Sequence, residues 1–564
     1  MNTKELLKKY FGFDDFKLNQ EIIIQSALEQ KDCLVIMPTG GGKSLCYQVP
    51  AIANKGFVLV ISPLIALMKD QVDALNQNKI PAAFINSTQT PFEQNEIIEQ
   101  LKNNQLKLLY LAPEKLMNDK SLIKLFQALP LNLIAIDEAH CISQWGHDFR
   151  PEYLILGRLK TYFPAVPIMA LTATADLQTQ SDIVLRLHIE NSTIYRNSFD
   201  RANIKYTVKA KLNYYQDLLN YVRQHKDDSG IIYCLSRNGT EELAELLSKD
   251  KIPAQAYHAG LTREIRDHRQ DDFINDRIKV ITATIAFGMG IDKSNVRYVI
   301  HADLPKNIEG YYQETGRAGR DGLDSEAILY YSKGDIFKLK KFTQIEDHPE
   351  QSKILLDKLN KIINYCENQG CRRQFLLQYF NEKTSDYCGN CDYCLSTFVE
   401  KDITIEAQKI LSAVIRLQER FGINYVIDFL KGSKSTRVEH QSLKTYGTIS
   451  NLSKELCKKY INELIRLSYL RISNGEYPLL KLDSRTNYVL FNNEQVIIRL
   501  KEAEVKSNVQ SRNPNSVAVQ GSLFANLKVI RTRLAQIEKV PPYLIFSDAT
   551  LQELAQYLPL TLED

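Results

Sequence analysis

The sequence predicts two consecutive α/β domains with parallel sheets, followed by smaller helical modules. The first observation is an alternation of short apolar runs with amphipathic stretches, which occurs twice along the 564 residues. The second is a glycine-rich loop directly after the first run, and the third is a cysteine cluster beyond the second series. At about 150 residues per domain, the length allows roughly three to five domains.

Composition excludes several classes of protein but names no partner. The chain has 71 Lys and Arg against 67 Asp and Glu, a formal net charge of +4. With 44% apolar and 24% charged residues, it is not a disordered, collagen-like or coiled-coil chain. No run approaches the roughly 18 apolar residues of a membrane span, and residues 1–15 do not resemble a signal peptide. We therefore expect a reducing compartment, in which the 10 cysteines are buried thiols or metal ligands.

Two series of apolar runs define the two sheets, with a joint near Arg201–Lys211. The first series is Cys33–Met37, Phe57–Ile61, Leu106–Leu111, Leu133–Ile136 and Ile168–Leu171. The second series is Ile231–Cys234, Ala254–Tyr257, Lys279–Thr282, Arg297–His301 and Ala327–Tyr331.

The last third of the chain has a different pattern. Helical periodicity follows Lys333, and residues 402–505 show helices and then three short strands, an order typical of a winged helix. The segment 507–522 is rich in Ser, Asn and Gln and indicates a linker, and a short helical piece, 523–564, follows it. The three predicted strands are Tyr469–Ile472, Leu479–Leu482 and Tyr488–Phe491.

The glycine-rich loop predicts a phosphate site. Three glycines let backbone N–H groups turn towards phosphate oxygens, and the following helix adds positive charge at its N-terminus. We expect Lys43 to reach the β- and γ-phosphates and the Ser44 hydroxyl to bind Mg²⁺. The alternative is a plain strand-to-helix turn. The loop is Pro38-Thr39-Gly40-Gly41-Gly42-Lys43-Ser44.

A pair of carboxylates follows another predicted strand, Leu133–Ile136. Acidic groups at the carboxyl end of a buried parallel strand face the ligand side of the sheet. Asp137 is expected to hold the Mg²⁺, and Glu138 to orient or deprotonate the attacking water. Alone, Asp137-Glu138-Ala139-His140 would also suit an acidic helix start.

Two arginines in the second α/β domain suit the leaving phosphate. Arg317 and Arg320 are three residues apart, which predicts one face of a helical turn. A guanidinium spans two phosphate oxygens, so an arginine from the facing domain would make hydrolysis depend on closure of the cleft. Surface salt bridges are the alternative.

An aromatic segment begins directly after the paired carboxylates. Trp145 and Phe149 can stack on bases, and His147 and Arg150 can meet phosphates or ring faces. Binding of a nucleic-acid strand to this segment could therefore move the groups that activate the attacking water. The alternative is that the aromatic side chains belong to the core.

The cysteine cluster has the spacing of a metal site. Two of the spacings between successive cysteines are only two residues long, so the thiolates can close on one tetrahedral ion. Two disulfides suit neither this spacing nor the compartment. Zinc and an iron–sulfur cluster both remain open from the residues alone. The candidate ligands are Cys371, Cys388, Cys391 and Cys394.

These motifs resemble those of RecQ-type DNA helicases of superfamily two, of the bacterial type, over nearly the whole chain. The phosphate loop with Met37, the Asp137–His140 box and Gln313–Arg320 resemble motifs one, two and six. The segment Cys141–Pro151 resembles the aromatic-rich loop of the family. Phe13–Gln20, Ile61–Met68, Ala170–Ala175, Ile231–Arg237 and Ala286–Lys293 resemble the family's segment before the phosphate loop and its motifs Ia, three, four and five.

The resemblance implies a domain plan and further site residues. The domains would be two RecA-like domains at 1–205 and 206–335, a zinc-binding subdomain at 336–400, a winged helix at 401–506, a linker at 507–522 and an incomplete helicase-and-RNase-D C-terminal domain at 523–564. We expect this last half-bundle to be loosely packed. Zinc is favoured for the cysteines. Gln20 would read the adenine edge, with Phe13 and Lys17 beside the nucleotide, and His140 and Gln313 would join the catalytic set.

The function that the resemblance implies is an ATP-dependent 3′–5′ DNA helicase using ATP, Mg²⁺ and Zn²⁺, acting in recombination and repair. Its partners would be single-stranded and forked or partly duplex DNA and a single-strand-binding protein, with no membrane. We expect a monomer in the bacterial cytoplasm, associated with the nucleoid. Three alternatives stay open: an RNA helicase, an ATP-switched DNA-binding scaffold and a small-molecule kinase. The second domain with Arg317 and Arg320 argues against the kinase.

Overall fold

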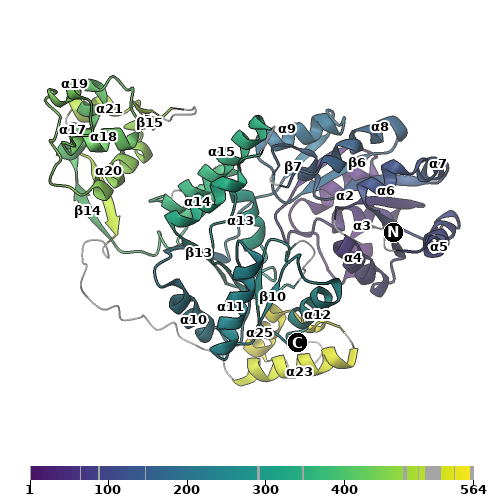
Figure 1. Cartoon of the computed structure of the whole chain (residues 1–564). Helices are drawn as coiled ribbons and strands as arrows, with labels where there is room; N and C mark the ends of the chain where they lie inside the picture. The colour runs from purple at the N-terminus through teal and green to yellow at the C-terminus, as the bar shows by residue number, and fades with distance from the viewer. Residues whose placement is uncertain are drawn as a thin grey trace. The chain divides into compact units, whose positions relative to one another are not determined.

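The computed structural model places most of the chain in two compact units, of which the larger holds both sheets and the smaller consists mainly of residues 393–517. Figure 1 shows helices flanking each sheet of the larger unit. The described residues are 2–63, 65–86, 89–146, 148–288, 293–345, 348–385, 387–473, 479–492, 494–501, 522–538 and 540–558.

The first sheet has seven parallel strands in the order β3-β4-β2-β5-β6-β1-β7. Its strands are β1 (Cys33–Ile36), β2 (Phe57–Ile61), β3 (Ala82–Ile85), β4 (Leu108–Leu111), β5 (Leu131–Ile136), β6 (Ile168–Thr172) and β7 (Thr193–Arg196). The helices are α1 (Thr3–Phe11), α2 (Gln20–Leu28), α3 (Leu45–Ala53), α4 (Ile65–Gln77), α5 (Pro91–Lys102), α6 (Pro113–Asn118), α7 (Lys120–Ala128), η1 (Ala139–Ile142), η2 (Pro151–Arg158), α8 (Leu159–Tyr162) and α9 (Leu177–Arg186).

The second sheet has six parallel strands in the order β10-β11-β9-β12-β13-β8. Its strands are β8 (Ile204–Ala210), β9 (Ser229–Tyr233), β10 (Ala254–Tyr257), β11 (Val280–Ala283), β12 (Val296–His301) and β13 (Ser325–Tyr331). The helices are α10 (Tyr214–Gln224), α11 (Arg237–Lys249), α12 (Arg263–Ile274), α13 (Ile308–Thr315) and α14 (Lys333–Phe342).

The central strands are apolar because helices cover both faces of each sheet. Val35, Leu59 and Ile134 are fully buried, as strands of a doubly covered parallel sheet must be. All five runs predicted for each sheet are strands. Three further strands were missed: β3, β7 and β8, and β8 occupies the segment that was predicted as the joint.

Two helices follow the second sheet, and the smaller unit then begins. The helices are α15 (Pro349–Glu367) and α16 (Arg372–Tyr379). In the smaller unit α17 (Thr404–Arg416), α18 (Ile423–Leu430), α19 (Val438–Gln441) and α20 (Lys454–Arg466) precede an antiparallel pair, β15 (Leu470–Ile472) and β16 (Leu480–Leu482). The strand predicted at Tyr488–Phe491 is wrong, because these residues lie in helix α21 (Thr486–Phe491). Strands β14 (Phe398–Asp402) and β17 (Ile497–Lys501) pair at its ends.

The C-terminal piece consists of α23 (Ser522–Glu538), α24 (Pro542–Ile545) and α25 (Asp548–Tyr557). Its centre is a buried ion pair, with Arg531 Nη1 2.7 Å from Asp548 Oδ1. Several apolar side chains of α23, such as Val529 and Ile537, remain exposed, as expected for a small helical piece. In the described part of the chain no helix is long and apolar enough to span a membrane.

Candidate nucleotide and nucleic-acid site

The phosphate loop connects β1 to α3. Gly40 and Gly42 have φ angles of +82° and +75°, in the left-handed region that favours glycine. Ser44 is the N-cap residue of α3, so the loop ends at a helix N-terminus. The loop therefore has the left-handed glycines and the helix start that the predicted anion cradle requires.

The loop is packed tightly against Gln20. A Cβ at Gly42 would lie 2.5 Å from Gln20 Nε2, so that only glycine fits there. The Gln20 amide donates to the carbonyls of Gly41 and Gly42, both at 3.1 Å, and its oxygen accepts from the backbone N–H of Lys17 at 2.9 Å. Phe13, exposed nearby, has the Lys17 ammonium 6.0 Å from its ring centre. Gln20 is buried against the loop, and the adenine-binding role of the three residues stays a prediction.

The paired carboxylates lie at the carboxyl end of β5. Glu138 has a φ of 48°, in the left-handed region that is uncommon for a residue other than glycine. Its Oε2 is buried without a hydrogen bond in the described part of the chain and lies 3.3 Å from His140 Nδ1. Burial and the Glu138 charge raise the pKa of Asp137, against the opposing charge of Lys43.

Both α/β domains line one cavity of about 270 Å³ at this point. Burial lowers the pKa of Lys43, while Glu138 and Asp137 act in the opposite direction. The cavity therefore places one ammonium group, two carboxylates and two guanidinium groups around a common space. Its lining includes Thr39, Gly40, Gly42, Lys43, Ser44, Asp137, Glu138, Gln313, Arg317 and Arg320.

The donor set fits a magnesium nucleotide. The glycine cradle offers N–H groups, and buried polar atoms such as Glu138 Oε2 and Arg317 Nε have no hydrogen-bond partner among the described residues. Ser44 and Asp137 offer a hydroxyl and a carboxylate, which are the hard oxygen ligands that Mg²⁺ prefers. These unpaired groups and the cradle match the phosphates, metal and water of an NTPase site.

The expectation that Arg317 and Arg320 share a helix is wrong. Helix α13 ends at Thr315, and both arginines lie in the turn that follows Gly316. Arg320 lies over the phosphate loop, since a Cβ on Gly40 would be 3.3 Å from its Cγ. Arg317 lies against Gly288, where an added Cβ would be 2.5 Å from its Nη2. Arg320 is thus the arginine that packs on the phosphate loop.

A chain of polar contacts joins the carboxylates to the second domain. His140 Nδ1 lies 2.9 Å from Thr172 Oγ1, which donates to the carbonyl of Thr174 at 3.2 Å. Gln313 of α13 donates to Thr174 Oγ1 at 3.3 Å. His140 and Gln313 therefore lie at the two ends of one path across the cleft. The sequence did not single out either threonine for this contact.

The aromatic segment is tied to the same site. Trp145 is 37% exposed and Phe149 is half-buried, so that both rings remain partly accessible. Arg150 pairs with Asp148 at 2.9 Å and donates to the carbonyl of Pro63 at 3.1 Å. The predicted contact His147 lies outside the described residues.

Tyr153 adds a link that the sequence did not reveal. It follows the aromatic segment, and its hydroxyl donates to the carbonyl of Asp137 at 3.1 Å. Asp148, inside the segment, lines a second cavity of about 290 Å³ together with Gln313 and Arg317. The aromatic segment therefore lies close to both Asp137 and the arginine loop, the turn that carries Arg317 and Arg320.

Binding of a single strand is expected to quench and shift the fluorescence of Trp145. The chain has one Trp, so its emission reports on this segment alone, and stacking on a base changes its environment. The measurement is a titration with oligo-dT at low and high salt, because phosphate contacts make binding weaken with salt.

The matched controls separate stacking from binding elsewhere. The variant Phe149→Leu retains the reporter and is expected to weaken the response, whereas Phe92→Leu on α5, an exposed ring of the same domain, leaves it unchanged. Tight binding by anisotropy with unchanged Trp145 emission would contradict a stacking role.

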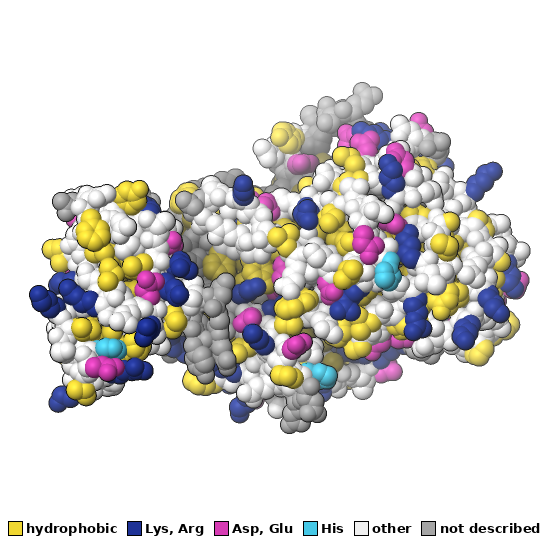
Figure 2. Space-filling view, turned by 90° about the horizontal axis from the view of Figure 1, so that it is seen from above, with side chains coloured by type: hydrophobic (Ala, Val, Ile, Leu, Met, Phe, Trp, Pro, Cys, Tyr) yellow, Lys and Arg dark blue, Asp and Glu magenta, His cyan; other side chains and the backbone are white. Residues whose placement is uncertain are grey.

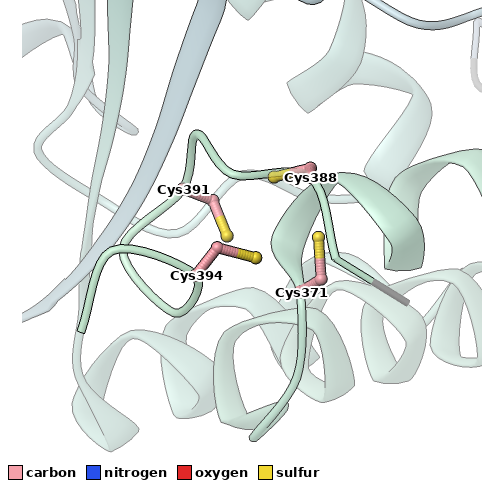
Figure 3. Close-up of side chains that lie close together, drawn as sticks. All are labelled: Cys371, Cys388, Cys391 and Cys394. Atoms are coloured by element: carbon pink, nitrogen blue, oxygen red, sulfur yellow. The ribbon is translucent and has the colours of Figure 1, made fainter. Parts of the chain in front are cut away.

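The four cysteines of the cluster converge, as Figure 3 shows for their sulfur atoms. One ligand atom from each lies within 4.8 Å of all the others, close to the sulfur separation of about 3.8 Å that a tetrahedral Zn–S distance of about 2.3 Å requires. None of the four forms a disulfide. Three are buried and Cys388 is half-buried, which suits a closed, structural zinc site. The four are Cys371, Cys388, Cys391 and Cys394.

Side chains of both charge signs lie on the face of the molecule that Figure 2 draws. Figure 2 shows Lys and Arg side chains spread among acidic ones over the visible face. This distribution agrees with the net charge of +4, so that any nucleic-acid contact must depend on locally placed cations.

Comparison with known proteins gives five matching family models along the chain. They are the DEAD/DEAH box helicase at residues 17–183, the helicase conserved C-terminal domain at 210–322, RecQ zinc-binding at 333–395, the RQC domain at 397–507 and the HRDC domain at 520–564.

Relatives match over almost the full length. The ATP-dependent DNA helicase RecQ of Haemophilus influenzae is 46% identical over 561 residues, covering 98% of this chain and 90% of the relative. The protein of the same name from Bacillus subtilis is 41% identical over 563 residues, covering 99% and 93%. The chain, with its two parallel-sheet domains, four-cysteine zinc cluster and RQC and HRDC regions, belongs to the RecQ family of helicases.

Proposed function

We propose that this chain hydrolyses ATP in the cavity between its two α/β domains and uses the cycle to move 3′ to 5′ along single-stranded DNA and unwind duplex. The observation that carries the proposal is the single cavity that holds Lys43, Glu138 and Arg320. The names of the relatives, ATP-dependent DNA helicases, support DNA as the substrate.

Each group around the cavity has a distinct part in hydrolysis. The loop N–H groups and Lys43 bind the phosphates, while Ser44 and Asp137 hold Mg²⁺, which neutralises developing negative charge. Glu138, whose Oε2 is free of hydrogen bonds in the described structure, accepts a proton from the attacking water or orients it. Arg320 stabilises the charge on the transferred phosphoryl group when the cleft is closed. Gln20 recognises the adenine edge.

DNA contact reaches this chemistry through the aromatic segment. Trp145 and Phe149 stack on bases, with His147 and Arg150 near the phosphates. Tyr153 transmits a shift of the segment to the backbone of Asp137, since its hydroxyl binds that carbonyl. In the winged helix, the exposed cations Lys434, Arg437 and Lys444 contact duplex backbone.

The test is strand displacement with ATP on duplexes carrying a 3′ tail, a 5′ tail or a fork. We expect unwinding of the 3′-tailed and forked substrates and none of the 5′-tailed one. The variant Lys43→Ala serves as the inactive control. Equal stimulation of the ATPase rate by RNA and DNA would favour an RNA helicase. An ATPase rate that neither nucleic acid changes would overturn the proposal.

We also propose that the chain acts as a monomer in the bacterial cytoplasm, at the nucleoid, with a single-strand-binding protein as a partner. The bacterial sources of two relatives support the bacterial setting. Light scattering of the purified chain is expected to give the mass of one copy, 64.7 kDa. A stable dimer at micromolar concentration would contradict the monomer.

A further inference from the structure

Arg201 lies in the linker between the two α/β domains and touches both halves of the nucleotide site. The linker joins β7, the last strand of the first sheet, to β8, an edge strand of the second. Arg201 is neither in the phosphate loop nor in the turn with Arg317 and Arg320. No motif of the sequence drew attention to it.

The Arg201 guanidinium donates to four backbone carbonyls. Nη1 lies 3.0 Å from the oxygen of Thr39 in the phosphate loop and 3.0 Å from that of Gly316. Nη2 lies 2.9 Å from the oxygen of Ala318 and 3.1 Å from that of Gly319. One planar fork thus binds the phosphate loop and the loop that carries the arginines. A lysine ammonium has its three donors on one nitrogen and cannot span this set.

The two loops touch where Arg201 binds them. A Cβ added to Gly316 would lie 3.4 Å from Thr39 Cβ, and one added to Gly40 would lie 3.3 Å from Arg320 Cγ. Asn203, two residues along the linker, donates to the carbonyls of Gly319 at 2.9 Å and Leu323 at 2.8 Å. The linker therefore fixes the arginine loop from two side chains.

The linker is itself held by α16 and the zinc loop. Arg373, a buried residue of α16, donates to the carbonyls of Arg201, Ala202 and Ile204 at 3.3, 3.0 and 2.9 Å. Asn390, between two zinc ligands, donates to the carbonyl of Ala202 at 3.2 Å. The backbone that presents Arg201 thus has fixed supports on its far side.

These contacts divide unequally between the domains. Three of the four carbonyls that Arg201 binds belong to the arginine loop, and one belongs to the phosphate loop. Opening of the cleft would break the Thr39 contact and leave the other three intact. We propose that Arg201 is a positioning residue for ATP hydrolysis, which sets the arginine loop against the phosphate loop when the cleft closes.

The inference rests on the proposed ATPase function and concerns the rate of its chemical step. A small displacement of the Arg320 loop is expected to lower kcat strongly, since about 1 Å of misplacement costs about a hundredfold. Nucleotide affinity should change little, because Lys43, Gln20 and the N–H groups of the glycine loop remain, and the phosphate loop loses only the contact at the Thr39 carbonyl. A residue that served only to stabilise the fold would instead lower the melting temperature and affect binding and turnover alike.

The test compares Arg201→Lys with the matched control Arg196→Lys in the full chain. Arg196, five residues earlier, donates to Gln180 at 2.8 Å and contacts neither loop through its side chain. Arg201→Lys is expected to lower the kcat of DNA-stimulated ATPase by about 10- to 100-fold, with KM for ATP and the Kd for a non-hydrolysable ATP analogue within about twofold. Its melting temperature should stay within about 4 °C, and Arg196→Lys should behave as the wild type.

A double variant tests the route of the effect. If Arg201 acts through the arginine loop, Arg201→Lys combined with Arg320→Lys should be little slower than Arg320→Lys alone. Fully additive losses would overturn that route. An active wild type with unchanged kcat in Arg201→Lys, or a loss confined to stability and nucleotide binding, would overturn the inference alone. A wild type without ATPase would overturn the proposed function, and the inference with it.

Discussion

Arg320→Ala is expected to lower the kcat of DNA-stimulated ATP hydrolysis by at least about a thousandfold, the lower end of the effect of an arginine finger. Arg320 is the arginine that packs over the phosphate loop, within van der Waals reach of the Gly40 position. Burial lowers the pKa of the Lys43 ammonium, and the charge of nearby Arg320 acts in the same direction. Without it, charge developing on the γ-phosphoryl oxygens loses a donor that needs no reorganisation at the moment of reaction.

The measurement is steady-state ATPase with saturating single-stranded DNA, together with binding of a fluorescent ATP analogue. Binding should persist in Arg320→Ala, because the loop N–H groups and Lys43 remain. Arg223→Ala is the control, since that exposed arginine of α10 pairs with Asp250 and lines no part of the cavity. An Arg320→Ala chain that retains more than about a tenth of the kcat would remove Arg320 from the transition state.

We expect Arg317 to have a different role from that of Arg320. It lines both the phosphate cavity and the second cavity, which Asp148 of the aromatic segment also lines. A group shared by the two cavities suits communication between them. The structure thus separates two arginines that the sequence could present only as a pair.

Most of the two sheets could be predicted because buried parallel strands are near-continuous apolar runs. The missed strands break that rule. Strand β8 lies at the edge of its sheet. Its apolar residues Ile204, Tyr206 and Val208 alternate with polar residues, so β8 is not a continuous apolar run. β3 is a short run that begins with two alanines. Tyr488–Phe491 was assigned to the wrong element because a short apolar run does not distinguish a strand from a helical turn.

The nucleotide site could be predicted in its chemistry but not in its connections. Lys43, Asp137 and Arg320 occur in recognisable motifs, and the structure brings them to one cavity. The helix expected at Arg317 fails because α13 ends at Thr315 and the chain continues through Gly316 into a turn. Arg201 could not be found, because its partners are backbone carbonyls, which leave no trace in a side-chain pattern.

Replacing Cys391 by serine is expected to remove zinc and unfold the surroundings of the cluster. Cys391 is fully buried, and its three partners are within 4.8 Å. Structural zinc contributes about 10–16 kcal/mol of apparent binding free energy in small modules, comparable to the whole stability of a domain at about 5–15 kcal/mol. Loss of one thiolate therefore leaves too little to order this loop.

The unfolding should spread through neighbours of the cluster. Asp392, next to Cys391, pairs with Arg372 of α16 at 2.9 Å, and its N–H donates to the Tyr206 carbonyl at 2.9 Å. Zinc content by mass spectrometry and limited proteolysis are the measurements, with Cys366→Ser as control, since Cys366 is buried on α15 outside the cluster. We expect Cys391→Ser to lose stoichiometric zinc and become cleavable near residues 371–394, and Cys366→Ser to retain the metal. A Cys391→Ser chain with full zinc and wild-type resistance to protease would show that the four thiolates are not one metal site.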